Sequence, residues 1–124
     1  MSETNNIILY VQDVDASVRF YAGTLELETL QSVPGFALLA LPSGLNLGLW
    51  KRDAVQPAAA AAPGGSEIGF KVDDAETVDA LFRTWSDKGV AIALPPTDLG
   101  FGRSFVGTDP DGHRLRVYAP ANAA

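Results

Sequence analysis

Apolar and polar positions along the chain follow two periods, and both periods recur in the same order in each half. Alternation with a period of two predicts short strands at residues 7–11, 28–33, 36–41 and 45–50, and again at 68–72, 90–94, 103–107 and 114–118. Apolar residues at helical spacing follow the first strand of each half; they are Val14, Val18, Tyr21 and Leu25, then Val78, Leu81, Phe82 and Trp85. The pattern therefore predicts the element order βαβββ twice.

Residues that typically begin and end secondary structure support these elements. Asp13 or Asp15 can cap the first helix and Asp74 the second, because their carboxylates accept bonds from free backbone N–H groups. Gly89 is typical of the left-handed residue that follows a helix. Loops and turns are expected at the stretches rich in Pro, Gly and Asp, which are residues 34–35, 42–44, 95–96 and 109–112.

A low-complexity stretch joins the two modules. Residues 54–65 read AVQPAAAAAPGG, and their proline and glycine residues oppose the helix that alanine alone would favour. We therefore expect a single domain over residues 1–124, with a first module at about 5–53, a linker at 54–65 and a second module at about 66–120. Matching segments support the repeat, since residues 11–18 align with 72–79 and residues 44–50 with 112–118.

Each predicted strand has one face that is purely aliphatic or aromatic, and we expect this face to pack under the helices. The opposite faces mix small, polar and aromatic side chains, whereas a plain solvated face would favour Lys and Glu. Two of the aromatic residues, Trp50 and Tyr118, fall at equivalent positions of the repeat. Aromatic side chains turned away from the helices suggest either a lined hollow or an interface.

Composition narrows the classes of function. Apolar residues make up 47% of the 124, which is enough for a hydrophobic core that needs no disulfide or structural metal. The chain has 9 basic and 15 acidic residues, which give a net charge of −6. This charge argues against nucleic acid or an anionic membrane as the partner. The chain has no cysteine, so disulfides, thiol catalysis and thiolate metal sites are excluded. The polar start does not resemble a signal peptide, and we expect a cytoplasmic protein.

Three segments resemble the vicinal oxygen chelate superfamily, which holds glyoxalases, ring-cleaving dioxygenases and bleomycin-resistance proteins. They are residues 8–21 with the pattern V-x-D…S-x-x-F-Y, residues 101–105, and residues 109–117, which begin D-P-D-G-H. The resemblance implies an α+β fold in which two βαβββ modules form a curved eight-stranded mixed sheet around a cavity. It also implies a homodimer.

Within that superfamily, residues 98–105 and 109–117 are similar to phenazine-antibiotic resistance proteins, and so are residues 66–69 and the strand end at Leu49 and Trp50. The resemblance implies a protein that binds the drug and sequesters it without altering it.

The resemblance also implies where enzymes of the superfamily bind a divalent metal, and this chain lacks the ligands. Four inward positions that carry His or Glu in such enzymes correspond here to Asn6, Gly48, Glu67 and Arg116. Glycine has no side chain, and an arginine cation has no lone pair to give. We therefore expect no metal and no other cofactor. Pairing of Glu67 with Arg116 is expected, with ligand contact or plain exposure of Glu67 as alternatives.

The other candidates for metal binding or catalysis are expected to have structural roles. His113 is the chain's only histidine, and we expect it to be a turn residue beside Asp109 and Asp111. No Ser-His-Asp arrangement or phosphate-binding loop is evident, since Gly64 and Gly65 lack the Lys-Ser/Thr that would follow.

Trp50 is the strongest candidate for ligand contact, because an indole at a strand end can stack on a flat aromatic compound. Packing at a dimer interface or at the rim is the alternative for Trp50, whereas Trp85 is expected in the core. Phe101 and Arg103 are expected in a loop that closes over the ligand, with Gly100 and Gly102 as hinges and Arg103 facing a ligand carboxylate. The candidate ligand-binding residues are Trp50, Tyr118, Tyr10, Phe36, Asn46, Phe101, Arg103, Arg116 and Glu67.

These features together predict a metal-free binding protein that sequesters a planar aromatic compound such as a phenazine-like antibiotic. Its expected partners are a small aromatic ligand and a second copy of the chain, and neither nucleic acid nor a membrane. The alternative is a lyase, isomerase or dioxygenase of the same fold that uses Glu67 and a metal. A third hypothesis is a scaffold or regulatory domain that has no small ligand.

Overall fold

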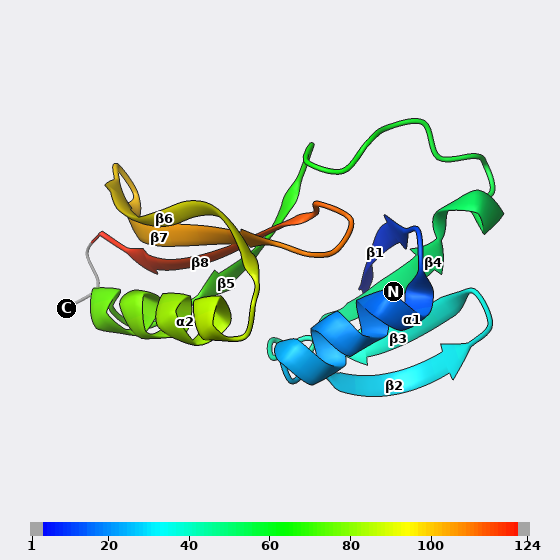
Figure 1. The fold of residues 1–124 in the computed structure, drawn as a ribbon, viewed down its shortest axis with the longest axis horizontal. Helices are drawn as coiled ribbons and strands as arrows, with labels where there is room; N and C mark the ends of the chain where they lie inside the picture. Colours follow the sequence, from blue (N-terminus) through cyan, green and yellow to red (C-terminus); the bar gives the residue numbers. More distant parts are fainter. Residues whose placement is uncertain (1–3, 122–124) are drawn as a thin grey trace. The chain divides into compact units, whose positions relative to one another are not determined.

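The computed structural model describes residues 4–121 and divides the chain into two compact units, with the boundary between Ala61 and Ala62. The first unit contains six main elements in sequence order (Figure 1). They are β1 (Asn6–Val11), α1 (Val14–Val18), a π-helical turn (Arg19–Thr24), β2 (Glu28–Val33), β3 (Phe36–Ala40) and β4 (Asn46–Lys51). A short 3-10 turn, Arg52–Ala54, follows β4.

The second unit repeats the same order with a longer helix. Its elements are β5 (Glu67–Lys71), α2 (Ala75–Asp87), β6 (Ala91–Leu99), β7 (Gly102–Thr108) and β8 (Arg114–Pro120). In both units a helix follows the first strand, and three strands follow the helix. The predicted βαβββ repeat is therefore confirmed.

The described strands pair as two four-stranded sheets with the same topology. The strand order is β1-β4-β3-β2 in the first sheet and β5-β8-β7-β6 in the second. The β1–β4 and β5–β8 pairs are parallel and the other pairs are antiparallel. These mixed sheets with their helices confirm the α+β fold class, and the hydrogen bonds join the eight strands as two groups of four.

The helix of the first unit covers one face of its sheet. Asp13 is the residue that caps α1, because its carboxylate accepts a hydrogen bond from the Ala16 N–H at 3.2 Å. The apolar residues that alternate along β1, β3 and β4 are buried on this face, as predicted; they are Leu9, Val11, Ala37, Leu39, Leu47 and Leu49. Val14 and Tyr21 from the helical segment complete the core of this unit.

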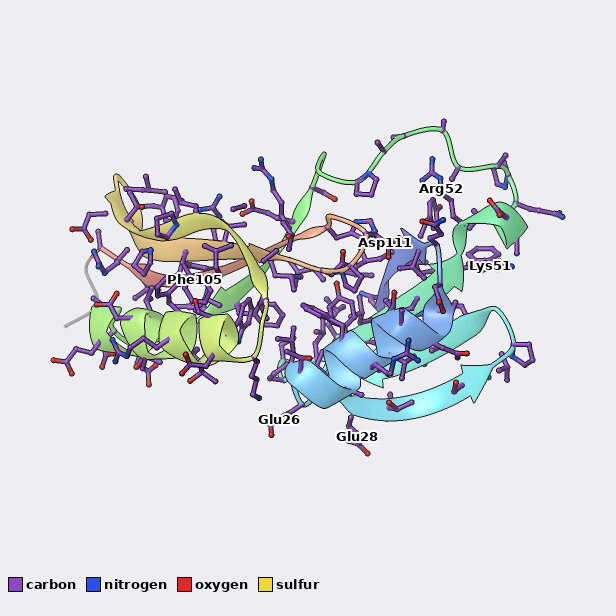
Figure 2. The ribbon with its side chains drawn as sticks, viewed as in Figure 1. Glu26, Glu28, Lys51, Arg52, Phe105 and Asp111 are labelled. Carbon is purple, nitrogen blue, oxygen red and sulfur yellow. The ribbon has the colours of Figure 1, made fainter. Side chains whose placement is uncertain are left out.

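The core of the second unit is an aromatic cluster between α2 and its sheet. Trp85 of α2 and Phe105 of β7 are buried, with ring centroids 5.1 Å apart, and Phe70 and Phe82 pack edge-on around them. Figure 2 shows Phe105 between the strands and α2. The expected core position of Trp85 is confirmed. Asp74 caps α2 and Gly89 follows the helix with φ of +85°, and both are as predicted.

One predicted loop is part of a strand. β6 runs from Ala91 to Leu99, so the expectation of a loop at residues 95–96 is wrong. Proline is tolerated here because β6 lies at the edge of its sheet, where the missing N–H removes no ladder bond, and the pairing with β7 is irregular between Leu94 and Thr97. Among residues 4–121, no helix is long and apolar enough to cross a membrane.

Candidate functional site

The face of the first sheet opposite α1, here called the first front face, carries most of the candidate residues of this unit. Alternation turns these side chains away from the buried face, and strand register places them side by side. The face consists of Asn6, Ile8, Tyr10, Phe36, Leu38, Ala40, Asn46, Gly48 and Trp50. The predicted assignment of these strand faces is therefore confirmed.

An aromatic row crosses the first front face. Tyr10, Trp50 and Phe36 are register partners on the adjacent strands β1, β4 and β3. The Tyr10 and Trp50 rings meet edge-to-face at 6.3 Å, Tyr10 is 37% exposed, and Trp50 and Phe36 are half-buried. Asn46 lies on the same face at the other end of β4, beside Asn6. The row therefore places three aromatic side chains on neighbouring strands of one face, with a polar pair of asparagines at the opposite end.

A glycine lets the Phe36 ring lie close to the sheet. A Cβ at Gly48 would lie 3.2 Å from both the Phe36 ring and Ile8 Cγ1. Any larger side chain at this position would therefore have to displace Phe36. The position cannot accept a metal-ligating His or Glu without rebuilding the aromatic row.

The corresponding face of the second sheet, opposite α2, is called the second front face. It carries charged residues beside aromatic ones, unlike the first. Its members from β5, β7 and β8 are Glu67, Gly69, Lys71, Ser104, Val106, Thr108, Arg114, Arg116 and Tyr118.

A hydrogen-bonded network fixes Arg116 at the centre of this face. Its Nε and Nη2 atoms donate to the two carboxylate oxygens of Glu67, at 2.5 and 3.2 Å. Its Nη1 atom donates to the hydroxyl of Ser104 at 2.9 Å. The side chains of Arg116 and Glu67 are 17% and 35% exposed. The predicted ion pair between Glu67 and Arg116 is present, and it is bidentate.

Two aromatic rings lie beside Arg116. The Phe101 ring meets Tyr118 edge-to-face at 6.1 Å, and its centroid is 5.9 Å from the guanidinium carbon of Arg116. The Tyr118 ring lies over Gly69, where a Cβ would be 3.3 Å from it. Phe101 is 50% exposed. The structure thus brings together Glu67, Arg116, Phe101 and Tyr118.

The backbone around Phe101 is tightly held, although the sequence suggests a mobile loop there. Phe101 lies in the short turn between β6 and β7, and its carbonyl accepts a hydrogen bond from the Ala121 N–H at 2.7 Å. Gly102 has φ of +144°, and a Cβ there would lie 1.9 Å from the Ala119 carbonyl oxygen. The expectation that Gly102 is a hinge is therefore wrong. Gly102 lies in a strand, at a point where the backbone of β7 packs directly against the end of β8.

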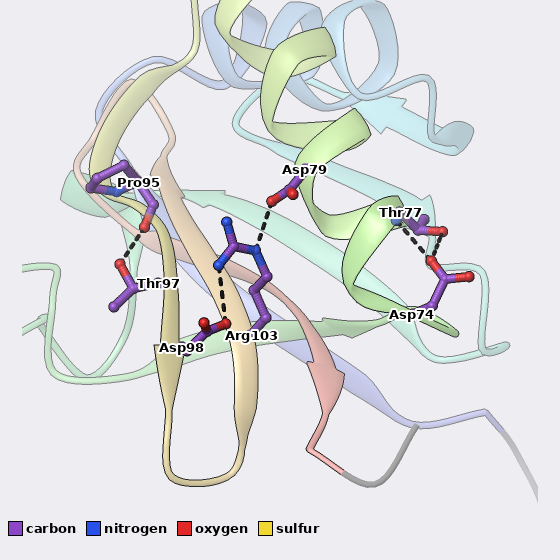
Figure 3. Close-up of polar contacts among 7 residues, drawn as sticks. All are labelled: Asp74, Thr77, Asp79, Pro95, Thr97, Asp98 and Arg103. Atoms are coloured by element: carbon purple, nitrogen blue, oxygen red, sulfur yellow. Dashed lines mark hydrogen bonds and ion pairs between the residues drawn. The ribbon is translucent and has the colours of Figure 1, made fainter. Parts of the chain in front are cut away.

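Arg103 does not lie in a loop, and this expectation is also wrong. It belongs to β7, where alternation places it on the same side as Phe105. Figure 3 shows Arg103 directed toward Asp79 of α2. Its Nε donates to Asp79 of α2 at 2.8 Å and its Nη1 donates to Asp98 of β6 at 3.0 Å. These bonds, the one to Asp79 first, raise the pKa of Arg103. Arg103 lines a cavity of about 280 Å³ with Ala75, Asp98, Leu99, Gly102 and Ala119–Ala121, away from Arg116.

The four positions that would supply metal ligands do not fit a divalent ion. Asn6 offers one amide, Gly48 has no side chain, and the Glu67 carboxylate is held by the cation Arg116. A divalent ion needs several oxygen or nitrogen donors, and a fixed guanidinium repels it. Within residues 4–121, no three or more His, Cys, Asp or Glu side chains gather in a group that could hold a metal.

The turn before β8 has the structural role that the sequence predicts. The Asp109 carboxylate accepts hydrogen bonds from the backbone N–H groups of Asp111 and His113, at 2.9 and 2.8 Å. Asp109 is buried and stabilises the turn.

Sequence reasoning missed Ser104 and Gly69. Ser104 is fully buried and holds Arg116, and Gly69 makes room for Tyr118. A signal for both exists, since alternation along the predicted strands places them on the same face as Arg116 and Tyr118.

Comparison with known proteins identifies relatives of this chain. Residues 4–117 match the model of the glyoxalase/bleomycin resistance protein/dioxygenase superfamily. The chain is 32% identical to the phenazine antibiotic resistance protein EhpR of Enterobacter agglomerans over 114 residues, which are 89% of this chain and 86% of that protein.

Two solved structures share the fold. A protein of Agrobacterium tumefaciens, solved by NMR in solution, is 42% identical with a TM-score of 0.86, over 98% of this chain and all of that one. A glyoxalase/bleomycin resistance protein/dioxygenase from Nocardioides is 23% identical with a TM-score of 0.84, over 100% of this chain and 87% of that one. From its matched sequence and its repeated modules, this chain belongs to the glyoxalase/bleomycin resistance protein/dioxygenase superfamily.

Proposed function

We propose that this protein binds a planar aromatic compound, such as a phenazine-like antibiotic, and sequesters it without altering it. The observation that carries the proposal is the aromatic row of Tyr10, Trp50 and Phe36 on a face that its own helix leaves uncovered. The relation to a phenazine antibiotic resistance protein, at 32% identity, supports the same class of ligand.

The dimensions of the row suit a flat ligand. Its three side chains stand on adjacent strands, which lie about 4.8 Å apart, so the row is about 10 Å wide. An aromatic ring that stacks on such a surface gains about 0.5–1.5 kcal/mol per ring pair beyond the burial of apolar area. Because the Tyr10 and Trp50 rings already brace each other, they lose little conformational freedom when a ligand binds.

Binding without chemistry is favoured by the state of Glu67. The alternative, an enzyme that uses Glu67 with a metal, needs a carboxylate that is available to the ion or the substrate. Both oxygens of Glu67 instead accept hydrogen bonds from Arg116. Glycine and arginine at two of the other ligand positions supply no donors. We therefore also propose that the activity is independent of metal.

We further propose that the protein is a homodimer. Large apolar side chains are more than a third exposed in both units of the chain; they are Ile8, Tyr10, Leu30, Val33, Leu99 and Phe101. Contact with a ligand and with a second copy would remove this apolar surface from water.

Titration of the protein with two phenazines, phenazine-1-carboxylate and phenazine-1-carboxamide, tests the proposed ligand class. Isothermal calorimetry measures the Kd, and chromatography of the released compound shows whether it is unchanged. We expect Trp50→Ala to weaken binding by roughly tenfold, the equivalent of about 1.4 kcal/mol. Arg19→Ala is the control, because it removes an exposed side chain from the helical segment and leaves the aromatic row unchanged. Absence of binding by both phenazines, or conversion of either one, would contradict the proposal.

A further inference from the structure

We propose that Arg116 is a carboxylate-binding residue, so that the preferred ligands are planar aromatic acids. This inference rests on the proposed function and specifies the class of compound. It follows from three features of the second front face: its charge, the hydrogen-bond donors that Arg116 has left, and the rings beside them.

The second front face is basic within an acidic protein. Three cations, Lys71, Arg114 and Arg116, share this face with one carboxylate, Glu67. The other front-face residues of β7 and β8 are uncharged, and the one charged residue of β6, Asp98, bonds to Arg103 on the opposite side of the sheet. The face therefore has a net charge of +2, whereas the whole chain has −6. A local charge of opposite sign favours an anionic ligand at this face over the rest of the surface.

Arg116 retains hydrogen-bond donors for such an anion. A guanidinium has five N–H groups. Glu67 accepts one from Nε and one from Nη2, and Ser104 accepts one from Nη1. One N–H on each terminal nitrogen is left, and two N–H groups of a guanidinium match the two oxygens of a carboxylate.

The network also fixes the orientation of these donors. Glu67 holds one edge of the guanidinium and the buried hydroxyl of Ser104 holds Nη1. Because the side chain is ordered before the ligand arrives, binding costs less side-chain entropy than it would for a mobile arginine. Glu67 and Ser104 are therefore positioning residues for Arg116.

The aromatic side chains around Arg116 suit a carboxylate that is attached to a ring. Phe101 lies 5.9 Å from the guanidinium carbon, and Tyr118 packs against Phe101. A ligand whose carboxylate meets Arg116 would thus have its ring next to an exposed phenyl group. An aliphatic acid would gain the ion pair alone, without contact between rings.

Comparison of phenazine-1-carboxylate with phenazine-1-carboxamide tests this inference, because the two probes have nearly the same shape and differ in charge. We expect the wild-type protein to bind the carboxylate roughly tenfold or more tightly than the carboxamide by calorimetry at neutral pH. Arg116→Gln should abolish this preference while binding of the carboxamide changes less than about threefold. Arg114→Gln is the matched control, since it removes the same charge from the same face but leaves the Arg116 network in place. It should retain most of the preference.

The outcomes separate the two proposals. If the carboxamide binds as tightly as the carboxylate, or if Arg116→Gln keeps the preference, the carboxylate assignment is overturned and the proposed ligand class stands. If neither phenazine binds, the proposed function itself fails. Should Arg116→Gln fail to fold because Glu67 loses its partner, the double variant Glu67→Gln/Arg116→Gln replaces the ion pair with two amides. The same loss of preference is expected in that variant.

Discussion

Replacement of Gly102 by alanine tests whether the turn that carries Phe101 depends on a contact between two backbones. Gly102 has φ of +144°, a conformation that side chains with a Cβ rarely adopt. The new methyl group would lie 1.9 Å from the Ala119 carbonyl oxygen and 2.8 Å from the Ala121 nitrogen. Neither of these atoms belongs to a flexible side chain, so β7 and the end of β8 would have to move apart.

The expected loss of stability follows from these two effects. A strained backbone conformation costs about 1–3 kcal/mol, and a forced separation of paired strands adds to it. We expect Gly102→Ala to lower the free energy of unfolding by about 3 kcal/mol and the Tm by roughly 10 °C. Urea denaturation monitored by circular dichroism measures the first quantity, and a thermal scan measures the second.

Gly100→Ala is the matched control for this experiment. Gly100 lies two residues away, has no atom within 4 Å of its Cβ position and has no positive φ. Its replacement should change stability by less than about 0.5 kcal/mol. If Gly102→Ala is no more destabilising than Gly100→Ala, the close approach of β7 and β8 is refuted. The conclusion that the backbone around Phe101 is tightly held would then also be refuted.

Other changes test the core, the helix cap and the assembly. Phe105→Ala removes a fully buried ring packed on Trp85 and should lower the free energy of unfolding, measured by urea denaturation, by about 3–5 kcal/mol. The exposed Phe101 is the control, and Phe101→Ala should lower it by less than about 1 kcal/mol. Equal losses in the two variants would contradict the assigned core. Hydrogen bonds from the Thr77 hydroxyl and N–H lower the pKa of Asp74, so its contribution to stability is present above the unfolded-state pKa and is lost as pH falls through the folded-state pKa. The Asp74→Ala variant should therefore have a lower free energy of unfolding than wild type at pH 7, and should lose less of it between about pH 5 and pH 2. Urea denaturation at several pH values measures this, and parallel plots of unfolding free energy against pH would argue against the cap. Light scattering should give twice the 13.1 kDa chain mass, and a monomer at micromolar concentration would contradict the proposed homodimer.

The fold could be predicted from sequence because local signals agree with the tertiary structure. Asp13 and Asp74 cap the two helices that the apolar spacing predicts, and Gly89 ends the second. The buried faces of β1, β5 and β8 follow simple alternation, and β4 departs from it at Gly48, which the Phe36 ring covers. Each of these features depends on neighbours within a few residues, so no long-range information is needed.

The extension of β6 could not be predicted in the same way. The two prolines at residues 95–96 signal a loop by composition, yet an edge strand accepts them, and whether a strand lies at an edge depends on the pairing of the whole sheet.

Arg103 shows a different limit. Alternation along the predicted strand at residues 103–107 already places Arg103 on the same side as Phe105, which is the buried side. The signal for its true direction was therefore present. Asp79 and Asp98, which bond to Arg103, lie on other elements, and sequence alone does not bring these three residues together.

Gly48 and Gly69 determine how closely an aromatic ring packs onto each sheet. Phe36 rests over Gly48 and Tyr118 over Gly69, so each ring lies nearer to the peptide plane than it would over any other residue. A single added methyl group at either position would displace the ring by a few tenths of an ångström without adding or removing a polar group. At these two positions a substitution can therefore change the space above the sheet without changing which kinds of polar group face it.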